Sequence, residues 1–280
     1  MSTGRLTLIC GGGGAKGAAH AGAMRALLEA GLEPDRFLGT SMGSVFAALF
    51  AAGLTPAEVA TRLEAISGEI VRSDPLALLK GLWARALLRP APFRAALERL
   101  VPARRFDELR HPLTVTAVDI DSAELVTFGA GGRDIPLLDA LYASCALPLF
   151  LPPLELEGRR YADGGLRAVV PLELALAWPT RGVVAVDVGP GFDEFAQASP
   201  PSALPPAIDI HSSATGILMA EQTAAALARW RADPARPPLV WVRPRTRRGS
   251  TFRVDQMRGY LEEGYAAARA ALADLNSGRG

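Results

Sequence analysis

Short apolar runs and longer stretches with helical periodicity alternate along most of the chain. The runs short enough for strands lie at residues 5–10, 37–40, 113–120, 125–128, 183–188 and 239–242. The stretches whose apolar positions recur at helical spacing lie at residues 17–30, 45–52, 136–146, 214–231 and 255–275. A further helix is predicted to start at residues 55–58, where Thr55 is placed as N-cap and Pro56 at the first helical position. This alternation of buried strands and helices is typical of an α/β fold.

Three further segments carry weaker patterns. Residues 154–156 and 160–162 flank a turn and predict a short hairpin. Leucines surround most of a helix circumference in segment 74–89, which we interpret as a core-packing helix, with a lid or membrane-contact helix as the alternative. Residues 189–206, rich in Pro, Ala and Ser, predict a long surface loop that is a second candidate for a lid.

Length and composition narrow the classes of protein. A chain of 280 residues fits one large α/β domain, which we expect at residues 1–275, followed by a flexible tail at 276–280. The net charge of +1 argues against a nucleic-acid partner. Two cysteines make neither a disulfide framework nor a zinc cluster. Because no basic-then-apolar leader and no apolar run of ~18 residues is present, we expect a cytoplasmic protein.

A glycine-rich turn follows the first predicted strand. Residues 9–17 read Ile-Cys-Gly-Gly-Gly-Gly-Ala-Lys-Gly and lead into an alanine-rich helix. Such a turn presents backbone N–H groups, which suit an anion. Lys16 and Gly17 close the motif, where the lysine would steady an anionic head group, cap the loop or face solvent.

A serine turn follows the second predicted strand. Residues 39–43 have the Gly-x-Ser-x-Gly form, in which Gly39 and Gly43 relieve the crowding of a tight strand-to-helix turn and leave the Ser41 hydroxyl accessible. Serine is a poor nucleophile at its own pKa, so Ser41 needs a base and hydrogen-bond donors for an oxyanion. The N–H group of Met42 is one candidate donor.

Asp163 is the candidate base. It follows the predicted hairpin and precedes Gly164 and Gly165, which let the backbone approach closely. A carboxylate with a pKa of ~3.9 is a weak base, but burial raises the pKa of such a group. A Ser-Asp pair therefore requires a desolvated cleft. The backbone N–H groups of Gly13 and Gly14 are the main candidate donors for the oxyanion.

The glycine loop, the serine turn and the Asp163 turn, in this order and spacing, resemble the patatin-like phospholipase family. The stretch 143–148, Ala-Ser-Cys-Ala-Leu-Pro, is similar to the family's segment upstream of its aspartate. The resemblance implies a three-layer α/β/α fold with a mostly parallel central sheet. It also implies a catalytic dyad of Ser41 and Asp163 without histidine, and an oxyanion hole formed by the loop from Gly12 to Gly14.

The same resemblance implies a lipid acyl hydrolase of phospholipase A or lysophospholipase type. Its substrate would be a lipid or another acyl ester, and peripheral contact with a membrane or micelle would fit this role. Met42 departs from the family, which commonly has alanine after the serine, and we expect it to narrow the pocket. We expect no cofactor and no metal, because the sequence has neither a calcium loop nor histidines at ligand spacing.

Three alternatives use the same residues. The glycine loop fits the dinucleotide-binding fingerprint, but the second strand does not end in the acidic residue that would hold a ribose. Ser41, Asp187 and His211 follow the order of an α/β-hydrolase triad, although only one strand precedes the serine turn. A lipid-binding module with an idle site is the third, and the presence of all three motifs disfavours it. We expect His20 to pack against its surroundings rather than transfer protons.

Overall fold

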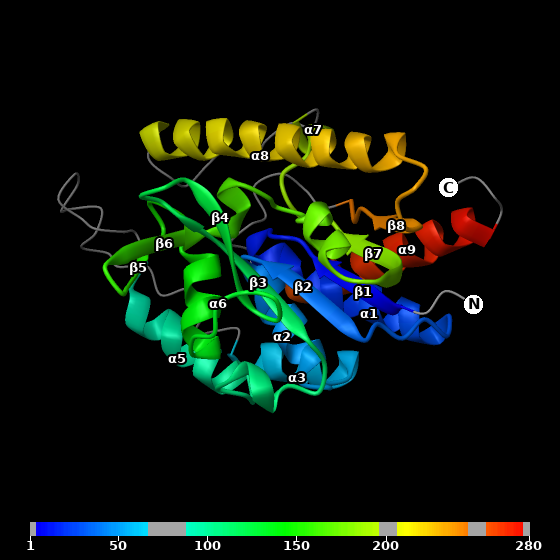
Figure 1. Cartoon of the computed structure of the whole chain (residues 1–280), viewed down its shortest axis with the longest axis horizontal. Helices are drawn as coiled ribbons and strands as arrows, with labels where there is room; N and C mark the ends of the chain where they lie inside the picture. The colour runs from blue at the N-terminus through cyan, green and yellow to red at the C-terminus, as the bar shows by residue number, and fades with distance from the viewer. Residues whose placement is uncertain (1–3, 67–87, 196–205, 246–255, 277–280) are drawn as a thin grey trace.

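The computed structural model describes residues 4–66, 88–195, 206–245 and 256–276 (Figure 1). The described strands form one sheet in the order β5-β6-β3-β2-β1-β7-β8, with β4 also paired to β3. The strands are β1 (Arg5–Cys10), β2 (Arg36–Thr40), β3 (Leu113–Asp119), β4 (Glu124–Gly129), β5 (Leu154–Leu156), β6 (Arg159–Asp163), β7 (Thr180–Val186) and β8 (Leu239–Val242). Each of the predicted strands is confirmed to within a few residues.

The helices flank this sheet. The α-helices are α1 (Ala19–Glu29), α2 (Met42–Ala51), α3 (Pro56–Ile66), α5 (Pro90–Leu100), α6 (Leu137–Cys145), α7 (Phe192–Phe195), α8 (Pro206–Ala232) and α9 (Met257–Asn276). Short 3₁₀ turns are η1 (Gly14–Ala18), η3 (Phe106–Glu108), η4 (Gly164–Leu166) and η5 (Leu172–Ala177). Two of these turns, η1 and η4, belong to the glycine-rich motifs.

The centre of the sheet is parallel. Strand β1 pairs in parallel with β2 and β7, β2 with β3, and β7 with β8. The pairs β3–β4, β3–β6 and β5–β6 are antiparallel. A buried parallel centre explains why the central strands read as continuous apolar runs rather than as alternating patterns.

Helices cover both faces of the sheet. Successive side chains of β1 point to opposite faces: Leu8 and Cys10 join a large apolar cluster with residues of α1, α2, α6 and α9, whereas Ile9 joins a smaller cluster that includes Trp230 of α8. In Figure 1, α8 lies along one side of the sheet and α2, α3 and α5 lie along the other. The three-layer α/β/α arrangement with a mostly parallel sheet is therefore confirmed.

Two strands meet end to end along one edge of β3. The parallel strand β2 runs beside its first half, with Thr40 opposite Thr116. The antiparallel strand β6 approaches from the other end and finishes with Asp163 opposite Ala117. Strand β4 pairs along the opposite edge. This pairing of β2 and β6 with the same edge of β3 brings Ser41, the residue after Thr40, next to Asp163.

Helices α1 and α9 pack with their backbones almost in contact. A methyl group added at Gly22 of α1 would lie 1.8 Å from the Leu261 carbonyl oxygen, and one added at Gly264 of α9 would lie 2.0 Å from the Ala19 carbonyl oxygen. Contacts this short leave no room for a side chain. Glycine at these two positions therefore sets the distance between the helices.

Several segments differ from the sequence-based expectations. Helix α5 was not expected, α8 begins at Pro206 rather than at 214, and α7 lies inside the predicted 189–206 loop. Most of the predicted helix at 74–89 and most of the remaining loop lie outside the described residues, as does the tail beyond Asn276. Among the helices that the structure describes, none combines the length and apolar character needed to cross a membrane.

Candidate active site

Ser41 occupies a sharp turn between β2 and α2. Its backbone has φ 54° and ψ −138°, a conformation that is costly for any residue with a side chain. Its N–H group donates to Ser144 Oγ at 2.8 Å, and its carbonyl oxygen accepts from Ser44 Oγ at 2.6 Å. A methyl group on Gly43 would lie 2.2 Å from the Cys10 carbonyl oxygen, so only glycine fits there. The surrounding structure thus holds the serine in its strained conformation.

Asp163 directly contacts the serine hydroxyl. Ser41 Oγ donates to Asp163 Oδ2 at 2.6 Å, and the other carboxylate oxygen accepts from the Gly165 N–H at 2.7 Å. The carboxylate is only 3% exposed, and this burial raises the pKa of Asp163 to about 6 although both hydrogen bonds oppose the rise. The desolvation that the sequence analysis required is therefore present, and it makes the carboxylate basic enough to take a proton near neutral pH.

The glycine loop lies against the serine turn. A methyl group on Gly12 would lie 3.0 Å from Ser41 Cβ, and one on Gly13 would lie 2.3 Å from the Val188 carbonyl oxygen. Gly14 has φ 59°, which glycine adopts at no cost. The Gly12 N–H already donates to the Val169 carbonyl oxygen at 3.1 Å. Among the three glycines expected to bind an oxyanion, this leaves Gly13 and Gly14 as the better donors.

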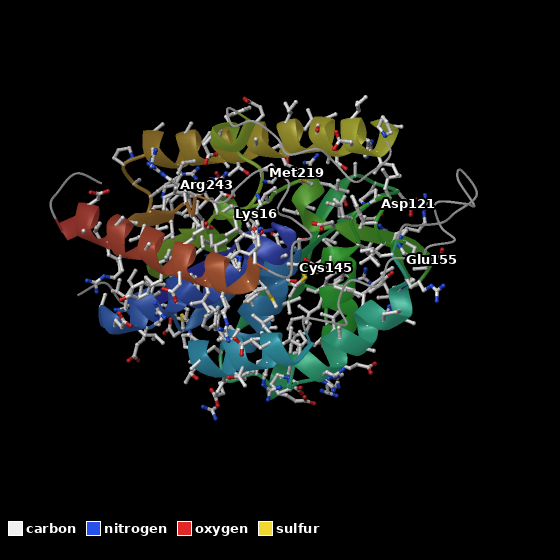
Figure 2. The ribbon with its side chains drawn as sticks, turned by 180° about the vertical axis from the view of Figure 1, so that it is seen from behind. Lys16, Asp121, Cys145, Glu155, Met219 and Arg243 are labelled. Carbon is white, nitrogen blue, oxygen red and sulfur yellow. The ribbon has the colours of Figure 1, made fainter. Side chains whose placement is uncertain are left out.

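Lys16, labelled in Figure 2, is buried rather than exposed at the surface. It is 2% exposed, in the turn η1 that connects the loop to α1. The interpretation of Lys16 as a solvated surface residue is therefore wrong. Gly17 packs beside α2, where a methyl group would lie 2.7 Å from the ring of Phe46.

Two sets of polar residues that support the site were missed by the sequence analysis. Ser144 is fully buried and accepts the Ser41 N–H. On the adjacent strands β2 and β3, the hydroxyl groups of Thr40 and Thr116 lie 2.7 Å apart. Thr40 Oγ1 also donates to the Ala168 carbonyl oxygen at 3.2 Å. A partial signal for Ser144 existed, because it lies in the stretch 143–148 that carries part of the family resemblance.

The residues of the alternative triad have other partners. Asp187 Oδ2 forms an ion pair with Arg243 Nη1 at 3.0 Å, and its Oδ1 accepts from the Gly189 N–H at 3.0 Å. His211 is exposed on α8, and its Nε2 lies 3.5 Å from Thr215 Oγ1. Ser41 meanwhile donates to Asp163. The geometry favours the dyad over the triad.

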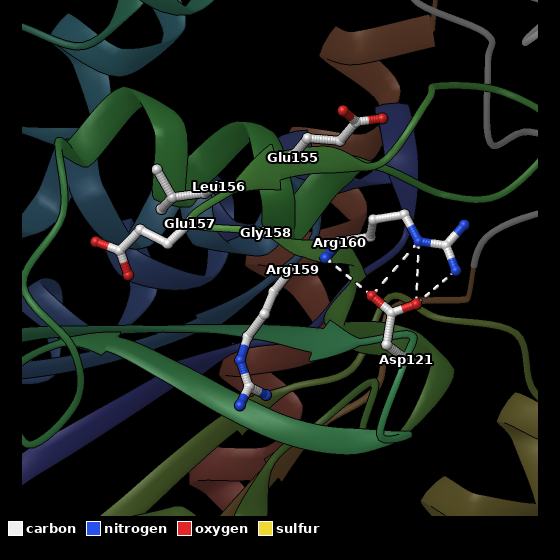
Figure 3. A pocket seen from close by; sticks show the side chains of 7 residues that line it. All are labelled: Asp121, Glu155, Leu156, Glu157, Gly158, Arg159 and Arg160. Carbon is white, nitrogen blue, oxygen red and sulfur yellow. Dashed lines mark hydrogen bonds and ion pairs between the residues drawn. The ribbon is translucent and has the colours of Figure 1, made fainter.

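A surface pocket lies at the β5–β6 hairpin (Figure 3). Arg160 reaches across it to Asp121, and its Nε lies 3.0 Å from Asp121 Oδ1. Arg159 donates to the buried carboxylate of Asp119 at 2.6 Å. The lining of this pocket includes neither member of the Ser41–Asp163 pair. Among the described residues no group of three metal-ligating side chains occurs.

Comparison with known proteins gives consistent matches. A Caenorhabditis elegans patatin-like phospholipase domain-containing protein is 34% identical over 188 residues, which cover 66% of this chain and 14% of that protein. A Mycobacterium tuberculosis protein, named an uncharacterized NTE family protein, is 33% identical over 172 residues, covering 61% of this chain and 45% of that protein. The chain therefore spans less than half the length of these relatives.

The crystal structure of VipD from Legionella pneumophila has a TM-score of 0.47 and 13% identity to this chain, and covers 96% of this chain and 67% of that one. A similarity at this level supports no inference about function. The family model of patatin-like phospholipase, in contrast, matches residues 8–176, which include the glycine loop, the serine turn and Asp163. The chain belongs to the patatin-like phospholipase family.

Proposed function

We propose that this protein is a lipid acyl hydrolase that cleaves carboxylic esters, of phospholipase A or lysophospholipase type, through a dyad of Ser41 and Asp163. The observation that carries the proposal is the 2.6 Å hydrogen bond from Ser41 Oγ to the buried carboxylate of Asp163. Membership of the patatin-like phospholipase family supports a lipid substrate. Peripheral contact with a lipid surface is part of the same proposal.

In the first half of the reaction, Ser41 Oγ attacks the acyl carbonyl carbon while its proton passes to Asp163. The tetrahedral oxyanion then collapses, the bond to the leaving alkoxide breaks, and Asp163 returns the proton to the alcohol. In the second half, Asp163 takes a proton from water, the hydroxide attacks the acyl-serine, and the acid is released as Ser41 regains its proton. No group beyond the dyad is needed to move these protons.

The oxyanion is stabilised by the N–H groups of Gly13 and Gly14 in this proposal. Their positions support it, because the preceding residue Gly12 lies directly against Ser41. Helix α2 begins at Met42, so its N-terminal N–H groups add positive potential beside the nucleophile. Such donors stabilise the transition state more than the substrate, and each is worth roughly a hundredfold or more in kcat.

The test is hydrolysis of short-chain and long-chain p-nitrophenyl esters and of phospholipid vesicles. Wild-type protein is compared with Ser41→Ala, Asp163→Asn and His211→Ala, each with and without a chelator. Removal of either dyad member should lower kcat by roughly a thousandfold or more, because the nucleophile or its base is lost. His211→Ala should retain most of the activity, and the chelator should have no effect.

The possible results separate the alternatives. Loss of activity in His211→Ala would support the triad and contradict the dyad. Wild-type protein that hydrolyses neither esters nor vesicles, and that a fluorophosphonate fails to label at Ser41, would contradict the enzyme and leave a lipid-binding module. A folded Asp163→Asn variant with normal turnover would remove Asp163 from the mechanism.

A further inference from the structure

One peptide unit of the glycine loop is held at both of its polar ends. The Gly12 N–H donates to the Val169 carbonyl oxygen at 3.1 Å, and the Gly11 carbonyl oxygen accepts from His20 Nε2 at 2.9 Å. The Gly11 N–H in turn donates to the Val186 carbonyl oxygen at 3.0 Å. Because a trans peptide is planar, its C=O and N–H point in opposite directions, and fixing both fixes the plane.

His20 is positioned to donate and not to exchange protons. It is 1% exposed, near the start of α1, and its ring centre lies 5.6 Å from that of Phe46. A carbonyl oxygen only accepts, so the proton of a neutral His20 stays on Nε2. Its Nδ1 is buried and has no hydrogen-bond partner among the described residues. Burial lowers the pKa of His20 to about 4, which keeps the ring neutral at neutral pH.

The Gly11–Gly12 peptide, fixed by these two hydrogen bonds, directly precedes the proposed oxyanion donors Gly13 and Gly14. Gly12 lies against Ser41, and Gly13 and Gly14 follow it without a side chain that could hold them in place. A glycine loop has many accessible conformations, so its amides aim at one point only if neighbouring groups restrict it. Val169, between η4 and η5, restricts the loop at the Gly12 N–H, and His20 of α1 restricts it at the Gly11 carbonyl.

We propose that His20 is a positioning residue for the hydrolysis reaction, and that its Nε2–H fixes the Gly11–Gly12 peptide so that the amides of Gly13 and Gly14 face the oxyanion. This inference rests on the proposed function. The side chain of His20 acts through the loop and does not contact the substrate. Loss of its donor weakens binding of the transition state and leaves ground-state binding of the ester unchanged, so kcat falls while KM stays constant.

The test compares His20→Leu with His20→Gln. Leucine fills the space next to Phe46 without a donor, whereas glutamine carries an N–H group at the same number of bonds from Cβ as His20 Nε2. We expect His20→Leu to lower kcat about 10-fold to 100-fold with KM within about twofold of wild type, and His20→Gln to recover most of the loss. Titration of reactive Ser41 with a fluorophosphonate corrects each rate for the folded fraction.

A merely structural role would give a different result. His20→Leu would then have a lower Tm but a kcat per titrated site within about threefold of wild type, and this would overturn the proposal. A His20→Gln variant as slow as His20→Leu, or a loss that appears in KM alone, would also overturn it. A matched change of His211→Gln on the exposed surface controls for non-specific effects of the substitution.

The protonation state of His20 provides a test that does not depend on activity. Long-range nitrogen–proton NMR spectra of the wild-type protein should show a proton on Nε2 and none on Nδ1, with no titration of this ring down to about pH 5. A proton on Nδ1 would overturn the proposal whatever the activity of the enzyme. The expected tautomer in a protein with no Ser41-dependent hydrolysis would instead overturn the proposed function, and the role of His20 with it.

Discussion

Ser41, the proposed nucleophile, has a backbone conformation that is unfavourable for a residue with a side chain. Its positive φ is imposed by the direct passage from β2 into α2 and is secured by Ser144 and Ser44. Such a conformation costs about 1–3 kcal/mol for a residue with a Cβ atom. The site therefore lowers the stability of the fold in exchange for an accessible hydroxyl.

The strain at Ser41 predicts an order of stability among inactive variants. Ser41→Gly should be more stable than Ser41→Ala by about 1–2 kcal/mol, because glycine adopts this conformation without a penalty and alanine does not. Both lose the Asp163 hydrogen bond, so their comparison isolates the backbone. Urea unfolding followed by circular dichroism measures the difference, and alanine at least as stable as glycine would contradict the strain.

At this scale, local sequence patterns predicted which residues lie together at the candidate site. Ser41 between two glycines, the glycine loop and Asp163 before two glycines are local patterns, and the structure brings them together. Neither the contact of Ser144 with Ser41 nor the partner of Asp187 was predicted, because both are set by the fold. Ser144 reaches a residue 103 positions away, and Asp187 pairs with an arginine 56 positions later.

At the scale of elements, the close approach of α1 and α9 depends on glycine. The α1–α9 packing allows no side chain at Gly22 or Gly264, whereas Gly259 of α9 has open space around its Cα. Shape complementarity of this kind is not a periodic pattern of apolar residues. A sequence that predicts both helices therefore does not reveal how closely they pack.

Alanine substitution at the two glycines of α9 should change the stability of the protein in opposite directions. Gly264→Ala should destabilise the protein by about 1–3 kcal/mol, because the added methyl group overlaps the Ala19 carbonyl. Gly259→Ala, the matched control, should stabilise it by up to about 1 kcal/mol through helix propensity. Thermal unfolding of both variants measures the effect. Equal shifts in Tm would contradict the close contact.

Helices α5 and α8 were missed, or placed too late, for different physical reasons. Helix α5 begins with two prolines, Pro90 and Pro92, which resemble loop residues but are tolerated in the first helical turn. Helix α8 starts eight residues before its expected position, and most of its side chains are partly or fully exposed. Apolar periodicity marks a helix that buries one face, and α8 buries only a few residues along its length.

At the scale of the whole molecule, the buried Asp163 links the proposed activity to global stability. Its pKa rises from 3.8 to about 6 on folding, so between these values the folded protein binds more protons than the unfolded chain. The free energy of unfolding therefore falls as the pH rises through this window, by an amount on the order of 3 kcal/mol. Above about pH 6, where the carboxylate of the proposed base is ionised, this cost is present in full.

Removal of the carboxylate should abolish this pH dependence. Asp163→Asn should be more stable than wild type at pH 8, and the difference should shrink towards zero as the pH falls to about 4. Asp119→Asn provides a control of opposite sign, because Arg159 and two backbone N–H groups hold the pKa of Asp119 below its usual range. Urea unfolding across pH 4–8 measures both. An Asp163→Asn variant less stable than wild type throughout would contradict the desolvation of this site.

The pairing of β2 and β6 with the same strand, β3, affects how the protein folds. Ser41 and Asp163 are 122 residues apart and meet only because β2 and β6 both pair with β3. Pairing over such a distance requires closure of long loops, which is slow compared with the formation of helices. A refolding chain therefore regains helical structure before it regains a reactive serine. Labelling of Ser41 by a covalent probe reports the completion of the sheet.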